Sequence, residues 1–418
     1  MIKAGVLLYS LAIALLIALL SSSIILFSFF TRTAIQKNST IEKLQLNANS
    51  AIQLMLAAPS KVPLDSPTKI DLFGDGNDSV TLIRKFWGGF EISIAISGQG
   101  RLEEKRAAMI GSTLHHQSKV SLYLADSDKP LSLCGKTIIK GICFLPKGEV
   151  KRAYIEGQNF MGDKLIDGEI KESDKDLPEV NKEMIENNIA YLSGQFNKTD
   201  SIVNFEKIID SIDISRSFSA NTLLIKSKEK IELTKQNFTG NIIVASDKGI
   251  FVGKGCSLGN IIIYAPFIEL ENYFTGSVQL FASDSLFIGE NSNLKYPSVA
   301  GLISSGEGVS KIHFKKNAEL SGVAFSYRKK IDNRIPFGFF IDEGTNIRGE
   351  VYSNGPIDLK GNVFGSLTCQ NFILSTPSAV YENHLLNVTI DYSLLSKHFA
   401  GINLTGNSEN RKIVKWLF

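Results

Sequence analysis

The chain has 418 residues, enough for two or three domains of ordinary size. Its 45 Lys and Arg against 42 Asp and Glu leave a formal net charge of +3, so no global field favours nucleic acid or an acidic substrate as a partner. A hydrophobic content of 44% is ordinary for a globular protein, but part of it is concentrated in one N-terminal run.

Residues 4–30 form this run and contain no charged side chain. As a helix the run would extend about 40 Å against a hydrocarbon core of about 30 Å, so it predicts a transmembrane anchor in contact with membrane lipid. A cleavable secretory signal is the alternative, because Lys3 supplies a basic start and residues 21–23 are small serines. The apolar run after those serines favours the anchor.

The placement of the remaining chain follows from this anchor. A large domain after one N-terminal span is usually exported, largely regardless of flanking charge. We therefore expect a single-pass protein of a bacterial inner membrane, with most of the chain periplasmic or extracellular and with other envelope proteins as partners.

Two segments follow the anchor. Residues 31–58 keep apolar side chains near helical spacing and predict a helical stem. Residues 59–130 predict a small α+β domain, with strands in "SVTLIRKF" and "FEISIAIS" and a helix at "RLEEKRAAMIGS".

Short apolar runs recur between residues 131 and 375. One series of triplets has intervals of 19, 18 and 18 residues and starts at Ile231, Ile250, Ile268 and Leu286. A second series starts at Asn221, Asn241, Asn260 and Ser277, and a third places Phe238, Leu258, Phe274 and Leu294 at corners. Two strands and a turn in every eighteen or nineteen residues predict a mainly β fold, a parallel and right-handed β-helix. Residues 171–220 are expected to be a helical insertion, and residues 376–418 to cap the open end.

Two resemblances rest on these patterns. The coil length and the "I-x-G" punctuation over residues 131–375 resemble the bactofilins, a bacterial polymer-forming family, which implies a scaffold that can associate with itself. At the N-terminus, "IKAG" before "VLLYSLAIALL" resembles the leader of type IV prepilins. That resemblance implies cleavage after Gly5, with the position of the family's glutamate falling at Ser10. Together they predict a non-enzymatic envelope scaffold or assembly protein, such as a minor pilin-like or pseudopilin-like subunit.

Two patterns bear on an enzymatic alternative. "GCSLG" at 255–259 fits the G-x-S-x-G elbow of serine hydrolases, but a strand-like run follows it where that elbow needs a helix. We therefore interpret Ser257 as a corner of the repeat and expect a bulky residue at Gly259 to disturb the stack. Glu232 and Glu269 would lie two coils and about 9–10 Å apart with Phe251 between them. This spacing leaves open a polysaccharide-degrading or polysaccharide-binding β-helical enzyme of the envelope.

Other candidate sites are local. Asp71, Asp75, Asn77 and Asp78 place oxygen donors around glycines as a calcium loop does, and a plain turn between strands is the alternative. Cys134 and Cys143 are spaced for a disulfide in an oxidising compartment, or remain thiols.

Two further clusters have a structural interpretation. The adjacent His115 and His116 would point apart, which favours no metal site there. The basic cluster Arg328, Lys329, Lys330 and Arg334 predicts a solvated loop, with contact to an anionic envelope polymer as the alternative. No catalytic residue and no cofactor is predicted.

Overall fold

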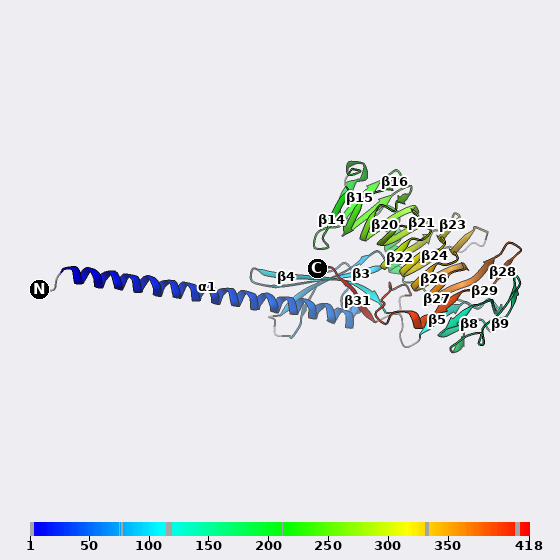
Figure 1. The fold of residues 1–418 in the computed structure, drawn as a ribbon, viewed down its shortest axis with the longest axis horizontal. Coiled ribbons are helices and arrows are strands. Elements are labelled where there is room, and N and C mark those ends of the chain that lie inside the picture. Colours follow the sequence, from blue (N-terminus) through cyan, green and yellow to red (C-terminus); the bar gives the residue numbers. More distant parts are fainter. Residues whose placement is uncertain are drawn as a thin grey trace.

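The fold consists of one long helix and a β-rich body (Figure 1). The computed structural model describes residues 4–418 except 75, 77, 114–118, 211, 331–333 and 406–409. Helix α1 (Ala4–Ala57) has 54 residues and projects far from the body. At 1.5 Å per residue it is about 80 Å long. Its side chains are exposed from residue 5 to residue 39, and burial on one face begins at Leu44.

The C-terminal part of α1 packs on a five-stranded antiparallel sheet in the order β1-β2-β3-β4-β31. The strands are β1 (Thr68–Asp71), β2 (Ser79–Trp87), β3 (Phe90–Gln99), β4 (Leu102–Ser112) and β31 (Arg411–Trp416). Alternation along the strands gives this sheet two apolar faces. Val80 and Leu82 face Ile52 and Met55 of α1, whereas Trp87 belongs to the opposite face. A 3-10 turn at Pro59–Lys61 separates α1 from the sheet.

Residues 102–112, where a helix was predicted, form strand β4 instead. This strand is paired with β3 on one side and with β31 on the other, and these ladders outweigh its local helical pattern. Ala107 and Met109 reach one face while Ala108 and Ile110 reach the other. The expected C-terminal cap is corrected as well, because β31 is an edge strand of this sheet and does not cover the end of the stack.

The remaining strands form the coil stack, a mainly parallel sheet that closes on itself. Each turn of chain pairs with the next, and the first predicted series is confirmed, since Ile231, Ile250, Ile268 and Leu286 are successive register partners. Inward-pointing side chains fill the interior with one continuous apolar core. The strands of residues 201–391 are β13 (Ser201–Asn204), β14 (Asp213–Arg216), β15 (Leu223–Ser227), β16 (Ile231–Leu233), β17 (Asn237–Gly240), β18 (Ile242–Ser246), β19 (Ile250–Val252), β20 (Ser257–Leu270), β21 (Thr275–Ile288), β22 (Asn293–Ser304), β23 (Ser310–Phe314), β24 (Glu319–Arg328), β25 (Phe337–Ile341), β26 (Asn346–Leu359), β27 (Asn362–Ser375), β28 (Val380–Glu382), β29 (His384–Leu386) and β30 (Thr389–Asp391).

The order of the coils along the stack differs from their order in the sequence. Residues 120–172 contribute β5 (Val120–Leu124), β6 (Leu131–Cys134), β7 (Ile138–Lys140), β8 (Ile142–Leu145), β9 (Val150–Arg152), β10 (Tyr154–Ile155), β11 (Gln158–Asn159) and β12 (Ile170–Glu172). Leu367 of β27 pairs with Leu122 of β5, which pairs with Cys143 of β8. The coils of residues 120–172 therefore extend the stack beyond the coils of residues 201–391.

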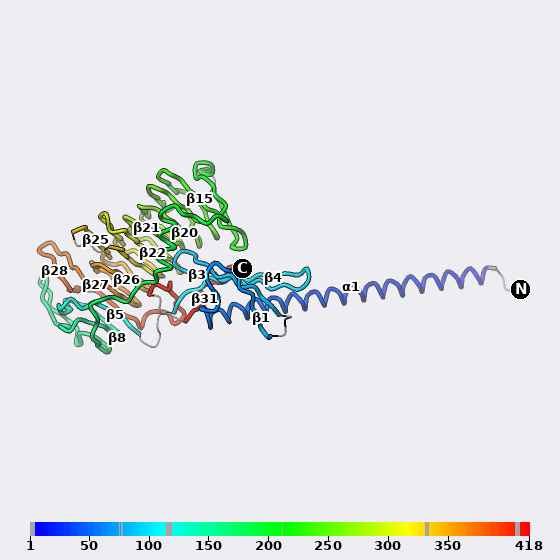
Figure 2. Tube along the Cα trace, turned by 180° about the vertical axis from the view of Figure 1, so that it is seen from behind, coloured from blue at the N-terminus to red at the C-terminus, as the bar shows by residue number. Residues whose placement is uncertain are grey.

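This order requires the chain to return along the whole stack, as the trace in Figure 2 shows. The return segment, residues 173–200, is here called the strap, and it carries helix α2 (Lys182–Leu192). The helix expected within residues 171–220 is therefore present, but its neighbours β13 and β14 are already strands of the first coil. The strap lies along one flank, where α2 contacts β20 and β21.

Glycines form one corner of the later coils. Gly322, Gly349 and Gly365 are successive register partners with φ of 152°, 150° and 155°. A Cβ at Gly349 would lie 1.8 Å from the carbonyl oxygen of Gly322, so only glycine fits there.

The third predicted series needs one correction. Phe238 and Leu258 are register partners as expected, but the partner of Leu294 is Gly276 and not Phe274. The ring of Phe274 lies 2.7 Å from where a Cβ of Gly276 would be, so the phenylalanine fills the space that the glycine leaves.

Candidate membrane anchor and binding sites

The first half of α1 is an exposed apolar rod. Among the residues that the structure describes, α1 is the one helix that is long and apolar enough to cross a membrane, and its apolar stretch has a mean hydropathy of 2.5. Leu8 is 70% exposed and Phe27 is 74% exposed. The Ser10 hydroxyl donates to the Leu7 carbonyl at 2.9 Å. Such a bond within the helix satisfies the hydroxyl where no water is present.

A polar contact holds α1 against the loop between β1 and β2. Asp78 is buried, and its carboxylate accepts hydrogen bonds from Lys43 at 2.9 Å and from the Asn47 amide at 2.8 Å. These two hydrogen bonds, first that from Lys43, lower the pKa of Asp78. The Asp78 carboxylate is therefore occupied by hydrogen bonds from α1.

The two predicted calcium donors that the structure describes, Asp71 and Asp78, have separate hydrogen-bond partners. Asp71 accepts backbone N–H groups of Gly74 at 3.1 Å and Gly76 at 2.8 Å and so caps its own turn, whereas Asp78 faces α1. Asp75 and Asn77 lie outside the described residues. Among the residues that the structure describes, no group of three or more His, Cys, Asp and Glu side chains is arranged to hold a metal ion.

A largely buried ion triad joins the segment that follows α1, the sheet and the C-terminal strand. Glu91 accepts from Arg84 at 2.6 and 3.0 Å and lies 3.2 Å from Arg411. Arg84 also donates to the carbonyls of Pro59 at 3.0 Å and Val62 at 3.2 Å. Burial lowers the pKa of Arg411. Because one carboxylate serves two guanidinium groups, removing Glu91 would leave two buried cations without compensation.

A group of buried hydrogen bonds, here called the junction, connects the antiparallel sheet to the coil stack. The Gln279 side chain of β21 accepts a hydrogen bond from the Gly89 N–H at 2.9 Å and donates one to the Trp87 carbonyl at 3.0 Å. It therefore binds both sides of the turn between β2 and β3. Asn188 of α2 donates to the other glycine of this turn at 3.2 Å and accepts the Tyr264 hydroxyl at 2.8 Å. The sheet, the strap and the stack therefore meet at one buried polar centre.

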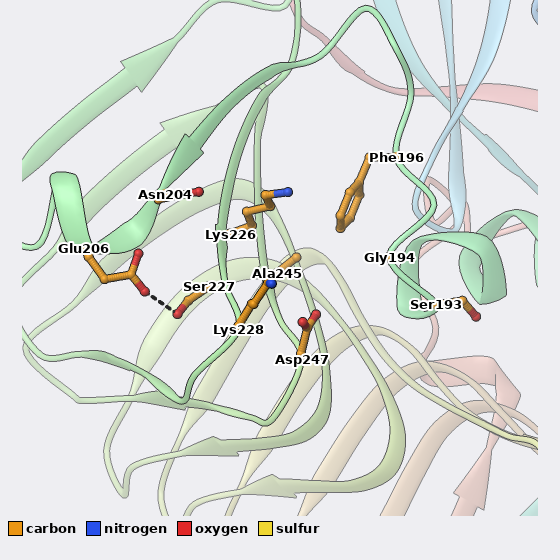
Figure 3. A pocket seen from close by; sticks show the side chains of 10 residues that line it. All are labelled: Ser193, Gly194, Phe196, Asn204, Glu206, Lys226, Ser227, Lys228, Ala245 and Asp247. Atoms are coloured by element: carbon orange, nitrogen blue, oxygen red, sulfur yellow. Dashed lines mark hydrogen bonds between the residues drawn. The ribbon is translucent and has the colours of Figure 1, made fainter.

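A cavity of about 600 Å³ opens between the end of the strap and the first coils (Figure 3). Phe196 comes from the strap, while Lys226 and Asp247 come from the stack. Glu206 accepts the Ser227 hydroxyl at 2.6 Å, and this hydrogen bond lowers the pKa of the Glu206 carboxyl. At neutral pH Glu206 is therefore an acceptor and is not suited to donate a proton as a general acid.

Ser257 lies at the start of β20 and is exposed. It is the first residue of this fourteen-residue strand, whereas a nucleophile elbow needs a helix after the serine. A Cβ at Gly259 would lie 3.4 Å from Thr239, an ordinary contact, so alanine fits there, and the disturbance expected from a bulky residue stays a prediction.

Glu232 and Glu269 occupy equivalent positions on either side of Phe251, as predicted. Each has a lysine neighbour, Lys230 at 2.9 Å and Lys315 at 3.8 Å. Their side chains are 61% and 37% exposed. They are solvated members of ion pairs on an open flank.

The predicted disulfide is absent, since Cys134 and Cys143 are free thiols. They point into different apolar clusters: Cys134 packs with Leu374, and Cys143 lies in the main core of the stack. Burial raises the pKa of Cys143 to about 12, so this thiol stays protonated and unreactive.

The expected basic cluster is divided by burial. Arg328 is only 3% exposed and donates to the carbonyls of Ile335 at 2.8 Å and Pro336 at 2.9 Å. Its guanidinium lies 4.3 Å over the Phe337 ring, so it holds the loop together from inside. Lys329 and Lys330 are exposed.

The histidine pair at 115 and 116 lies outside the described residues.

Gln279, Asn188 and Glu91 are not among the residues predicted from the sequence. Asn188 carried a signal, because it is a polar residue among the buried positions of an amphipathic helix. Gln279 and Glu91 lie in strands at buried positions where apolar residues are usual, and only their partners from other segments explain them.

Comparison of the chain with protein-family models, with curated proteins and with solved structures gave no significant match.

Proposed function

We propose that this protein is a non-enzymatic envelope protein, a minor pilin-like subunit that carries the coil stack outside a bacterial inner membrane. The observation that carries the proposal is the division of α1 into an exposed apolar half and a half packed on an antiparallel sheet. A helix of this kind after the leader "IKAG" is what the prepilin resemblance implies, including cleavage after Gly5. The apolar half anchors the protein in lipid, and the sheet transmits that anchoring to the stack.

The second part of the proposal concerns the coil stack. We infer that it is a right-handed parallel β-helix of the bactofilin-like kind, used as a rigid scaffold for other envelope proteins. The parallel register between successive coils supports this inference, as does the general right-handedness of parallel strand crossovers. The triad at Glu91 joins the segment after α1 to the sheet, and the junction at Gln279 joins the sheet to the stack, so together they fit a rigid connection.

The anchor is tested by paired charge substitutions on α1. Leu15→Lys with Leu16→Lys places two ammonium groups within the apolar run, at a cost of roughly 3 kcal/mol each near a bilayer centre. Thr33→Lys is the matched control, because it is equally exposed but lies beyond the run. We expect the wild type and Thr33→Lys to need detergent for release from membranes, and the double variant to lose membrane retention.

Topology is read in the same cells by adding protease to intact spheroplasts. The proposal predicts digestion of the body and protection of the residues within the bilayer. A body that stays protected until the spheroplasts are lysed would place it on the cytoplasmic side and contradict the proposal.

A further inference from the structure

One flank of the coil stack carries outward-pointing side chains that are in register from coil to coil, here called the outer ladder. Each is the central residue of a short strand segment whose neighbours on both sides are buried, as Ile250 and Val252 are around Phe251. In register order its members are Glu232, Phe251, Glu269, Phe287, His313, Phe340 and Asp358. Phe340 is 37% exposed, and the rings of Phe251 and Phe287 are half-buried.

Aromatic rings recur on this ladder at every second coil. Phe251, Phe287 and Phe340 are each two register steps apart, which corresponds to about 10 Å between successive rings. The His313 ring fills the interval between the last two, with its centroid 6.4 Å from Phe287 and 5.7 Å from Phe340. Phe267 widens the strip, because its ring centroid lies 5.5 Å from that of Phe287. The result is an aromatic strip that runs along the axis of the stack.

Most charges beside this strip are paired, while the Nζ of Lys311 lies 4.8 Å from the centroid of the Phe287 ring and Asp342 lies 3.0 Å from His313. Glu232 lies 2.9 Å from Lys230, Glu269 lies 3.8 Å from Lys315, and the terminal member Asp358 lies 3.8 Å from Lys360. With Lys311 and Asp342 included, four lysines and four carboxylates lie along the strip, so it has no large field that would select a polyanion or a polycation. The same pairs place ammonium donors and carboxylate acceptors next to the aromatic rings, which suits a ligand rich in hydroxyl groups.

The next flank of the stack is already occupied. Its outward residues, including Tyr264 and Phe281, are fully buried beneath the strap and the antiparallel sheet. Tyr264 stacks on Tyr191 of α2 with ring centroids 5.2 Å apart. The outer ladder has comparable aromatic content but remains open to solvent, so it is a flank on which an extended ligand can lie.

We propose that the outer ladder binds an uncharged, extended β-1,4-linked glycan that lies along the axis of the stack. The C–H groups on one face of a sugar ring pack on the electron-rich face of an aromatic ring. An extended β-1,4 chain turns the same ring face toward a flat surface at every second sugar, and this repeat fits the two-coil interval of Phe251, Phe287 and Phe340. The flanking ion pairs hydrogen-bond the hydroxyl groups. This binding does not depend on how the N-terminus is processed.

The test is calorimetric titration of the full chain in detergent micelles with soluble six-sugar probes. Cellohexaose and the hexamer of β-1,4-linked N-acetylglucosamine share the extended repeat, maltohexaose has a curved α-1,4 chain, and a galacturonate hexamer carries negative charge. We expect the two β-1,4 hexamers to bind and the other two to bind at least about tenfold more weakly.

Variants locate the binding on the ladder. Phe287→Ala and the more exposed Phe340→Ala should each weaken the β-1,4 hexamers about tenfold, while Phe287→Trp retains binding. Tyr154→Ala is the matched control, because this ring is 65% exposed but lies off the ladder, and it should leave the affinity unchanged. Unchanged melting of Phe340→Ala separates lost binding from misfolding.

Three results would overturn the proposal. They are no binding of either β-1,4 hexamer, equal binding of maltohexaose, and binding that both Phe287→Ala and Phe340→Ala leave intact. A concentration-dependent dimer that Phe340→Ala abolishes, without any glycan binding, would assign the ladder to a second copy of the chain instead.

Discussion

Glu350 makes the stability of the coil stack depend on pH. It lies on β26, its Oε2 is 3.2 Å from where a Cβ of Gly401 would be, and no lysine, arginine or histidine of the described residues forms an ion pair with it. Burial under residues 392–404 raises the pKa of Glu350 from 4.5 to about 7. The carboxyl group is therefore protonated in the folded protein at pH values where the unfolded chain has already lost this proton.

The sign and the size of the effect follow from these two pKa values. Below pH 4.5 Glu350 is protonated in both the folded and the unfolded state, so it has no effect on the free energy of unfolding. Between pH 4.5 and 7 the free energy of unfolding falls as pH rises. Above pH 7 the destabilisation by Glu350 reaches its full size. Because a difference of one pKa unit between the two states corresponds to ~1.4 kcal/mol, the loss of unfolding free energy approaches about 3 kcal/mol at pH 8.

Glu350→Gln keeps the shape and removes the charge. We expect urea unfolding, followed by tryptophan fluorescence, to show this variant more stable than the wild type by about 3 kcal/mol at pH 8, with the difference shrinking toward pH 5. Glu307→Gln, at an exposed position, is the control and should change little at any pH. A difference between Glu350→Gln and the wild type that is the same at pH 5 and pH 8 would refute the reasoning.

Three further substitutions test the sheet, its junction with the stack and the glycine corner by the same unfolding assay, and the last of them also by proteolysis. Glu91→Gln leaves two buried guanidinium groups with a weakened partner and should cost roughly 3–5 kcal/mol, whereas Glu103→Gln breaks an exposed pair and should cost under ~1 kcal/mol. Equal losses would show that the triad adds nothing. Gly349→Ala should cost more than about 3 kcal/mol or prevent folding, while Gly259→Ala is nearly neutral; a stable Gly349→Ala protein would refute the tight corner. Gln279→Leu leaves a buried N–H and a buried C=O unpaired, at about 1–3 kcal/mol each, and should speed proteolysis between sheet and stack, unlike Gln99→Leu at an exposed site.

The repeat could be predicted because each coil must place apolar residues at the same inward positions. The series at Ile231, Ile250, Ile268 and Leu286 is therefore visible as a spacing in the sequence and as a register in the structure. Strands β2 and β3 were equally visible, since they alternate and end at a glycine turn.

The order of the coils could not be predicted by the same reasoning. An inward pattern identifies a coil but not the coil on which it stacks, so nothing local shows that β5 follows β27. The same limit applies to β4, whose helical pattern gives way to pairing with β3 and with the distant β31. The junction at Gln279 depends on partners about 190 residues away in the chain, which no local pattern contains.

The central claim, a pilin-like subunit held in the membrane by α1, is tested most directly by N-terminal sequencing of the chain extracted from membranes. We expect a mature protein that begins at Val6, and we expect Gly5→Val to retain Met1 while Ser10→Ala is still processed. A membrane-extracted wild-type chain that still begins at Met1, or one that begins after the serines at 21–23, would contradict the claim.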